Sequence, residues 1–391
     1  MGCGSSSRTK KPSVEAARRR LSVGQVDGAG AEPNLDVTED DRGLITGLNQ
    51  ENVLQMIQAD AAGGGRKFSI GSSTDQGKTS FANKAMTEIG EKVDQAAAGL
   101  GYTCRKGLKP ESPNQDSWMV LKVESDFSIY GVFDGHGQKG HDISNFVKDN
   151  LVKLIVKDTR FQSGHNELKS VCIDSFRKVQ SLIATMDQMK KLDAKLSGTT
   201  CTIAIHDHHK NSLTVAHVAD STAVLGRWKE PAKSGLEAFQ LTRDHKPDLK
   251  DERARIEKAG GRVVFDGYAN HRIYAKNARY PGLNMSRCLG DLMGHQDCGI
   301  TCEPEVLEQA VQPQDHLLLL CSDGVWEFIT PQEAVDFVSM YRPLEGMAAA
   351  EKLAKEAWDR WIREEGGAVV DDITVLLVFL HQAAKPRETA S

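Results

Sequence analysis

Three aspartates stand at the ends of apolar runs, where a strand could hold a carboxylate in a fixed place. Apolar runs lead into Asp134-Gly135 and into Asp323-Gly324, and Asp371 stands just before a third run. Hard divalent cations prefer oxygen ligands on rigid supports, and a glycine lets a backbone carbonyl approach as well. A single Asp-Gly after a strand is most often only a turn. The three together, rather than any one of them, indicate a site for a divalent cation.

The elements that must hold these residues are strands and helices in mixed order. Period and composition predict strands at 117–123, 127–133, 199–206, 213–218, 222–228, 317–321 and 373–380. Helices are predicted at 143–157, 166–191, 248–259, 331–341 and 344–365. The strands come as hairpin-like neighbours and the helices cluster between these groups. This arrangement favours an α+β fold in which two packed sheets are flanked by helices.

Composition excludes several classes of protein. The 391 residues are 39% hydrophobic and 26% charged with a formal net charge of −5, which argues against a globally basic nucleic-acid binder. No run reaches the roughly 20 apolar residues of a membrane-spanning helix. The eight cysteines form no CxxC pair and several stand in apolar runs, as buried thiols of a reducing compartment do. We therefore expect no nucleic-acid partner.

The first quarter of the chain differs from the rest. Up to about residue 100 it is rich in Gly, Ser, Ala and charge and has few β-branched or aromatic clusters. Such a segment buries too little apolar surface to offset the entropy lost on ordering. We expect residues 1–100 to be a largely disordered tail with one short helix at 51–61. A catalytic domain at 101–382 and a short tail at 383–391 follow.

Nine short motifs occur in one order along the chain. They are DGHG at 134–137, SGTT at 197–200, ADS at 219–221, DHKP at 244–247, AGGR at 259–262, SRCLGD at 286–291, EPE at 303–305, CSDGVWE at 321–327 and DDITV at 371–375. The series resembles that of the metal-dependent protein serine/threonine phosphatases of type 2C. The resemblance covers about residues 102–380.

This resemblance implies a four-layer α-β-β-α sandwich of two mostly antiparallel sheets, with a binuclear Mg²⁺ or Mn²⁺ centre in a cleft at one end. By motif position, Asp134 resembles the carboxylate that both metals share, and the Gly135 carbonyl resembles a ligand of one of them. Asp323 and Asp371 resemble ligands of the other. Two such ions lower the pKa of a water molecule and neutralise phosphoryl oxygens.

Further roles follow from the same resemblance. Asp116 looks like the family's acidic residue that acts through a metal-bound water. Asp220, with Asp323 and Glu327, matches a weaker third metal site. His136 looks like the general acid, since an imidazole can protonate a departing serine or threonine oxygen at neutral pH. The alternative for His136 is a structural hydrogen bond in the turn.

The chain also departs from the family pattern. Gln115 replaces an acidic residue, which brings no charge and would reduce metal affinity. Ala219 stands where the family has glycine. The arginine that clamps substrate phosphate in many members is missing, and the nearest cations are Arg105, Lys106 and Lys109. Lysine binds phosphate as a point charge without the bidentate fork of arginine, so the phosphate-binding residue stays unassigned.

Two eye-catching clusters are expected to be structural. The run His206-Asp207-His208-His209 falls between two predicted strands, where a polar hairpin loop is expected rather than a metal site. Cys298 and Cys302 are close in sequence but have no second ligand pair nearby.

The N-terminus carries a lipidation pattern. Gly2 and Ser6 fit N-myristoylation, and Cys3 can add the second lipid that stable anchoring needs. A basic stretch over residues 8–20 would attract anionic headgroups. We expect the cytoplasmic face of a membrane, the plasma membrane, with a cytosolic pool. Basophilic kinases would accept Ser22 or Ser69, and phosphate at Ser22 would weaken membrane attraction.

Three functions remain to be weighed. The first is a lipid-anchored, Mg²⁺- or Mn²⁺-dependent phosphatase acting on phosphoserine and phosphothreonine in phosphoprotein substrates. The second is a pseudophosphatase that binds a partner without turnover, and the third is a phosphatase for small metabolites. The carboxylates and His136 favour chemistry, whereas Gln115 and the missing arginine weigh against it.

Overall fold

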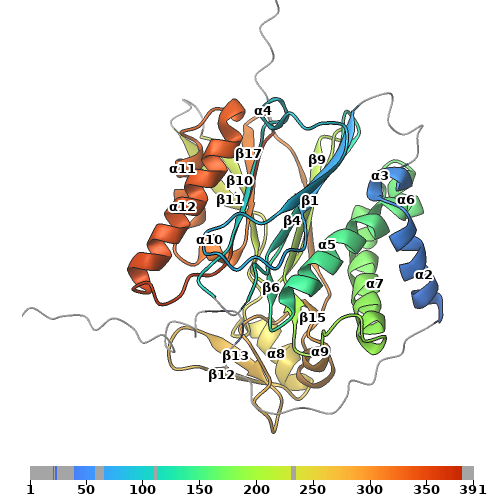
Figure 1. Ribbon diagram of the computed structural model, residues 1–391, viewed down its shortest axis with the longest axis vertical. Coiled ribbons are helices and arrows are strands. Elements are labelled where there is room, and N and C mark those ends of the chain that lie inside the picture. The colour runs from blue at the N-terminus through green and yellow to red at the C-terminus, as the bar shows by residue number, and fades with distance from the viewer. Residues whose placement is uncertain are drawn as a thin grey trace, which may run out of the picture.

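Two antiparallel sheets stacked between layers of helices form the body of the molecule (Figure 1). The computed structural model describes Leu21, Val23 and residues 39–57, 66–109, 112–229 and 235–380. The larger sheet has the order β16 (Glu305–Ala310), β9 (Ser212–Val218), β8 (Cys201–Asp207), β5 (Phe127–Phe133), β4 (Ser117–Val123), β1 (Lys67–Ser72), β2 (Met86–Gly90). The smaller has the order β11 (Leu236–Gln240), β10 (Thr222–Trp228), β17 (Asp315–Cys321), β18 (Ile373–Phe379), β3 (Leu100–Arg105).

Helices cover the outer face of each sheet. Against the larger sheet lie α3 (Val53–Met56), α5 (Gly140–Lys157) and α7 (Leu168–Gln188), whereas α2 (Glu39–Gln50) packs on α7, and α6 (Thr159–Gln162) on α5 and α7. Against the smaller sheet lie α10 (Asp323–Trp326), α11 (Pro331–Val338) and α12 (Gly346–Glu364), the last preceded by the 3₁₀ turn Pro343–Glu345. The short α4 (Gln95–Ala98) leads into β3. The predicted four-layer sandwich and the α+β class are confirmed.

A smaller unit lies below the sheets in Figure 1, beside β6 and β15. It contains α8 (Lys250–Lys258), the sheet β12 (Arg262–Phe265), β13 (His271–Tyr274), β14 (Pro281–Leu283), and α9 (Leu292–Cys298). Another small sheet pairs β15 (Leu289–Gly290), β7 (Gly198–Thr199) and β6 (Gly135–His136). The second small sheet therefore ties the unit to the segment that follows β5.

The central strands are apolar on both faces because both faces are buried. In β17, Leu317, Leu319 and Cys321 face the α11–α12 layer, whereas Leu318 and Leu320 pack between the two sheets. This alternation is the period of two expected for a strand. Burial on both sides gives a continuous apolar run, which is why the sequence predicted these strands so closely.

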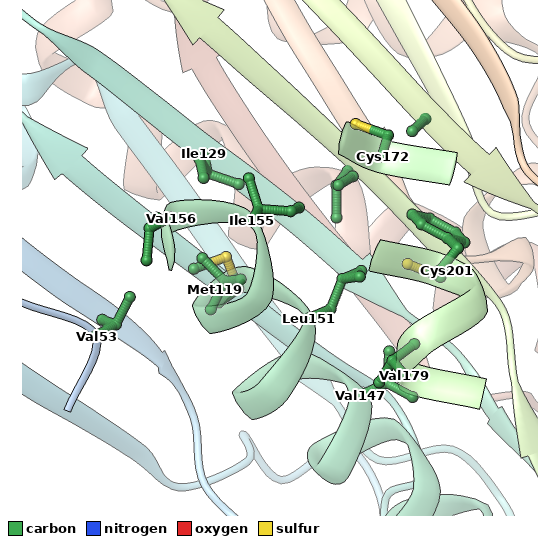
Figure 2. Close-up of a cluster of buried hydrophobic side chains, with 14 of the residues drawn as sticks. Val53, Met119, Ile129, Val147, Leu151, Ile155, Val156, Cys172, Val179 and Cys201 are labelled. Carbon is green, nitrogen blue, oxygen red and sulfur yellow. The ribbon is translucent and has the colours of Figure 1, made fainter. Parts of the chain in front are cut away.

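Figure 2 shows the corresponding layer between the larger sheet and its helices. Side chains of α5, such as Val147, Leu151 and Ile155, lie over Met119 of β4 and Ile129 of β5. Fully burying one such aliphatic side chain stabilises the fold by about 1.5–3 kcal/mol. This packing fixes the sheet ends from which the candidate site is built.

The structure differs from the expected disordered tail in residues 39–57 and 66–100. Helix α2 buries Ile45 and Leu48 against the larger sheet's helical layer, and β1 pairs with β2 on one side and β4 on the other. The predicted helix at 51–61 is only the four-residue α3, and residues 58–61 lie outside the described part. Long-range pairing stabilises these elements, and composition within the segment does not reveal it.

Three further predictions can be placed on the structure. Ser69 lies in β1, whose backbone pairs with a strand on each side, which argues against a kinase site there because a kinase needs an acceptor segment free of such pairing. Ser22, Gly2 and Cys3 lie outside the described residues. Among the described helices, none has the length and apolar character required to cross a bilayer.

Candidate metal centre

The strand registers bring the predicted carboxylates to one end of both sheets. Ser117 is paired with Phe133, so Asp116 just before β4 and Asp134 just after β5 share an end of the larger sheet. Cys321 of β17 pairs with Val375 of β18 and with Thr222 of β10. Asp323 after β17, Asp371 before β18 and Asp220 before β10 therefore share the matching end of the smaller sheet.

Most of these carboxylates are buried, Asp323 is half-buried, and they lie close to one another without enough positive charge to balance them. Burial, and then the charges of Asp116, Asp323 and Asp371, raise the pKa of Asp134 well above its ordinary value. Burial and then Asp371 and Asp220 do the same for Asp323. Burial and then Asp372 raise the pKa of Asp116 to about 7. Such shifts arise where like charges are held together away from water.

Several of the oxygens at this centre lack a hydrogen-bond partner. Oδ1 of Asp116, of Asp220 and of Asp323 are each buried with no donor. A buried acceptor left without a donor costs about 1–3 kcal/mol. Carboxylate and carbonyl oxygens are the ligands that Mg²⁺ and Mn²⁺ prefer. The residues present therefore fit a centre for hard divalent cations.

Gly135 lies where no side chain would fit. A Cβ placed on it would approach the backbone oxygens of Gly140 at 2.4 Å and of Gln115 at 2.5 Å. The backbone of residue 135 therefore passes close to two other backbone segments at the end of β5. This close approach explains the glycine.

His136 makes a hydrogen bond that the sequence did not identify. Its Nε2 lies 2.5 Å from Oδ2 of Asp291, and its Nδ1 is buried without a partner. A Cβ on Gly198 would lie 2.1 Å from that same Asp291 oxygen, so glycine leaves room for the pair. Asp291 stands in the SRCLGD motif, which sequence analysis quoted without giving this residue a role.

The second aspartate of the DDITV motif is a support for the centre. Asp372 accepts hydrogen bonds from the backbone N–H of Gly107 and of Gln115, both at 2.7 Å. Gln115 in turn donates from its side-chain Nε2 to the Gly137 carbonyl at 2.7 Å. The residue that replaces the family's acid thus ties the 115 loop to the 134–137 loop through its amide.

A lysine from the segment expected to be disordered also supports this loop. Lys84 is buried, and its Nζ donates to the backbone oxygens of Asn114, at 3.2 Å, and of Asp116. Burial lowers the pKa of its ammonium. Oδ2 of Asp116 accepts from Ser322 at 2.8 Å and Thr374 at 2.6 Å. Nothing in the sequence around Lys84 signals this contact.

The structure gives different partners to the three cations that stand near the position of the family's phosphate-binding arginine. Arg105 pairs with Glu351, and Lys106 donates to the backbone oxygen of Lys109 at 2.8 Å. Lys109 alone among the three forms an ion pair with Asp371. Burial opposes its charge, but Asp371 and Asp372 outweigh burial and raise the pKa of Lys109.

Asp220 also has a lysine partner. Lys246 forms an ion pair with Oδ2 of this carboxylate. Glu327, the other residue expected at a third cation site with Asp323, is exposed. The structure thus places Asp220 at the end of the smaller sheet, with one of its oxygens bound to an ammonium.

The histidines of two other clusters contact neighbouring side chains. In the hairpin between β8 and β9, His208 lies 3.1 Å from Ser128 Oγ and His209 lies 3.2 Å from Asp126. His217 and His245 stack at 4.6 Å beside Glu305, where Arg243 already pairs with that glutamate. In the first cluster Asp207 lies beside His165 and Lys210, so the acids of both clusters lie against basic side chains of the protein.

Comparison with known proteins agrees with this geometry. A family model described as protein phosphatase 2C matches residues 108–365. A probable protein phosphatase 2C 48 of Oryza sativa subsp. japonica is 32% identical over 337 residues, which cover 80% of this chain and 93% of that protein. A probable protein phosphatase 2C 73 of Arabidopsis thaliana is 33% identical over 292 residues, which cover 69% of this chain and 76% of that protein.

Solved structures show the same fold. The serine-threonine phosphatase 2C from Toxoplasma gondii superposes with a TM-score of 0.62 at 22% identity. It covers 72% of this chain, and 94% of its own length is matched. A sex determining protein of C. elegans superposes with a TM-score of 0.60 at 20% identity, covering 75% of this chain and 66% of that one.

Proposed function

This chain belongs to the protein phosphatase 2C family and is a metal-dependent protein serine/threonine phosphatase, and on that premise we propose that the carboxylate centre is where phosphoserine and phosphothreonine are hydrolysed. One observation supports this placement above all. Buried carboxylates from both sheets meet at one end, with unpartnered oxygens and, for three of them, raised pKa values. Strongly perturbed carboxylates in one cluster are typical of a functional site.

We assign the cations to named residues. Asp134, the Gly135 carbonyl, Asp323 and Asp371 would hold two Mg²⁺ or Mn²⁺ ions, Asp116 would lie beside them, and a weaker third ion would use Asp220. Bound there, the ions supply an acidified water and positive charge for the phosphoryl oxygens. No nucleophilic side chain is then required.

The protein's own residues position and protonate the substrate. Asp291 accepts the Nε2 proton of His136 and thereby fixes the ring, which leaves Nδ1 as the nitrogen from which a proton passes to the departing oxygen. Lys109 is the cation that we assign to the substrate phosphate, because it alone of the three candidates reaches Asp371. As a lysine it offers a point charge.

The test is hydrolysis of a phosphothreonine peptide across a Mn²⁺ titration, with binding followed by calorimetry. We expect phosphate release that needs Mn²⁺, stops with EDTA and is lost in Asp371→Asn. Lys109→Ala should raise KM more than it lowers kcat. Folded protein that binds the peptide without turnover would instead identify a pseudophosphatase. A higher kcat/KM for a small sugar phosphate than for the peptide would identify a metabolite enzyme.

We also propose that the enzyme works at a membrane surface. The support is the sequence pattern at Gly2 and Cys3 together with the basic residues that follow. Mass spectrometry of chain expressed in eukaryotic cells should find myristate on Gly2 and a thioester on Cys3, and Gly2→Ala should move the protein into the soluble fraction. Equal membrane fractions for Gly2→Ala and the unchanged chain would contradict anchoring. Ser22→Glu should weaken partition onto anionic vesicles.

A further inference from the structure

Lys246 holds one oxygen of a carboxylate that the proposed function gives to a cation. Its Nζ forms an ion pair with Asp220 Oδ2, whose side chain is 1% exposed while that of Lys246 is 33% exposed. The other oxygen of Asp220 is buried without a donor. The Lys246 ammonium therefore pairs with one of the two carboxylate oxygens. The lysine side chain can move out into solvent, whereas the buried carboxylate cannot.

The backbone keeps Lys246 beside Asp220. Its neighbour His245 donates its backbone N–H to the carbonyl of Ala219 at 3.0 Å, and His245 Nδ1 accepts the Ala219 N–H at 3.0 Å. The His245 carbonyl also accepts the backbone N–H of Ser286 at 2.8 Å. These bonds place Lys246 at the point where the smaller unit of α8 and β12–β14 joins the sheets.

The surroundings of Lys246 are acidic, so its charge is held there. Asp220, Asp244 and Asp323 all lie near enough to favour the ammonium, although the Lys246 side chain is only one third exposed. Thr222 Oγ1 donates to Asp244 Oδ1 at 2.9 Å, which fixes that carboxylate as well. Among the residues that the structure describes, Lys246 is the cation paired with Asp220.

We propose that Lys246 is a built-in counter-cation of the Asp220 site, which a divalent cation must displace before it can bind there. An ammonium and a divalent ion cannot share Asp220 Oδ2, and two cations a few ångströms apart repel each other strongly in a partly buried site. Competition by Lys246 thus weakens cation binding at Asp220 and sets the metal concentration at which the site fills. This inference rests on the proposed function for the other two cation positions.

The experiment counts Mn²⁺ bound to the purified full chain by calorimetry and by electron paramagnetic resonance, at neutral pH and without substrate. Lys246→Met removes the charge and keeps the length of the side chain. We expect the weakest Mn²⁺ to bind at least about tenfold more tightly, a change of about 1.4 kcal/mol, with a smaller change for the tighter ions. Lys246→Arg is the matched control and should retain weak binding.

A double variant tests whether the added Mn²⁺ affinity arises at Asp220. In the double variant Lys246→Met, Asp220→Asn, the added affinity should disappear, whereas independent effects would simply add. Unchanged or weaker binding of the last ion in Lys246→Met, with an unfolding midpoint close to that of the original chain, would overturn the inference. If the unsubstituted chain bound no Mn²⁺ tightly, the proposed function would be contradicted. Even then, an additional Mn²⁺ bound by Lys246→Met would support the role of Lys246 as a counter-cation.

Discussion

Two clusters of buried and half-buried acidic side chains lie near each other in this protein, and their charges are balanced in different ways. The carboxylate centre, Asp116, Asp134, Asp220, Asp323 and Asp371, has unpartnered oxygens at three of its members. The arginine network consists of Glu252 and Glu305 with Arg243, Arg255 and Arg287. In it, Glu252 accepts from Ser286, Arg255 and Arg287.

The pKa values separate the two clusters. Burial raises the pKa of Asp134 and Asp323 at the centre. Burial acts on Glu252 as well, but the hydrogen bonds from Arg287 and Arg255 outweigh it and lower the pKa of Glu252. The nearby His245 ring, 3.6 Å away, and the hydrogen bond from Arg243 lower the pKa of Glu305 to about 2.

The difference shows that burial of an acid does not by itself indicate function. Glu252 is fully buried, yet its charge is balanced within the protein and it ties α8 to the segment around Ser286. Asp134 is equally buried and lacks such a balance, so the centre is stable as a charged group only with added cations. Stability and activity should therefore respond in opposite ways to neutralising one acid in each cluster.

The largest expected effect is on activity at the centre. Asp134→Asn should lower kcat at least about 1000-fold, or about 4 kcal/mol, because a shared cation ligand is lost. The free energy of unfolding in EDTA at neutral pH should stay the same or rise, because a repelled charge is removed. Phosphopeptide turnover and urea unfolding measure the two effects. An Asn variant that is much less stable would contradict the contrast.

The arginine network should show the reverse. Glu252→Gln leaves Arg255 and Arg287 with an uncharged partner, and breaking a buried ion pair costs about 3–5 kcal/mol. Urea unfolding should show this loss. The kcat of the remaining folded protein, measured well below its unfolding midpoint, should change little. A large fall in kcat at unchanged stability would place Glu252 in the catalytic machinery instead.

The carboxylates of the centre and the residues that support them were not equally predictable from sequence. Asp134, Asp323 and Asp371 each follow or precede an apolar strand, so the local pattern and the family motifs marked them. Asp291 lies 155 residues from His136, and no local pattern reports such a contact. Asp372, Lys84 and Lys246 likewise act through contacts with distant backbone or side chains.

The same limit explains the error in the first hundred residues. Strand β2 is exposed along its whole length and α2 buries few side chains, so local composition resembles that of a tail. Pairing of β1 with β4 orders the segment. The central strands were predicted because burial on both faces gives each strand a nearly continuous apolar sequence, as in β4 and β17.

The next largest effect expected is a difference between the two clusters in how stability depends on pH. The pKa of Asp116 is raised from 3.8 to about 7, so the folded metal-free state holds this proton more tightly than the unfolded chain. The free energy of unfolding in EDTA should therefore fall as pH rises from about 4 to 7. Glu305 has a lowered pKa, so its contribution is present above its ordinary 4.5 and is lost as pH falls toward about 2.

Urea unfolding at several pH values, with EDTA and with saturating Mg²⁺, separates these contributions. Mg²⁺ should remove the loss of stability toward neutral pH, because bound cations replace the proton as the balancing charge. Mg²⁺ should not prevent the loss of stability at low pH, because arginine side chains already balance the acids of the arginine network. Stability that rises between about pH 5 and 7 in EDTA would contradict the account of the centre.

The smallest effect is expected at Ala219, which joins the two clusters. This residue precedes Asp220, donates its N–H to His245, and has a φ of 75°. A left-handed conformation costs an alanine about 1–2 kcal/mol, which glycine avoids. Glycine loses about 0.5–1 kcal/mol of chain entropy and about 0.8 kcal/mol for the buried methyl group. The contributions nearly cancel, so Ala219→Gly should lie within about 0.5 kcal/mol of the original chain.

Ala350 supplies the matched control for this cancellation. It is as fully buried as Ala219 but lies inside helix α12, where no left-handed strain is relieved. Ala350→Gly loses the methyl group and about 1 kcal/mol of helix propensity, so its unfolding free energy should fall by about 2 kcal/mol. Equal losses for the two glycine variants would mean that Ala219 carries no strain. A small loss at Ala219 alone would show that its left-handed backbone, at the residue whose N–H binds His245, is strained as alanine and relaxes as glycine.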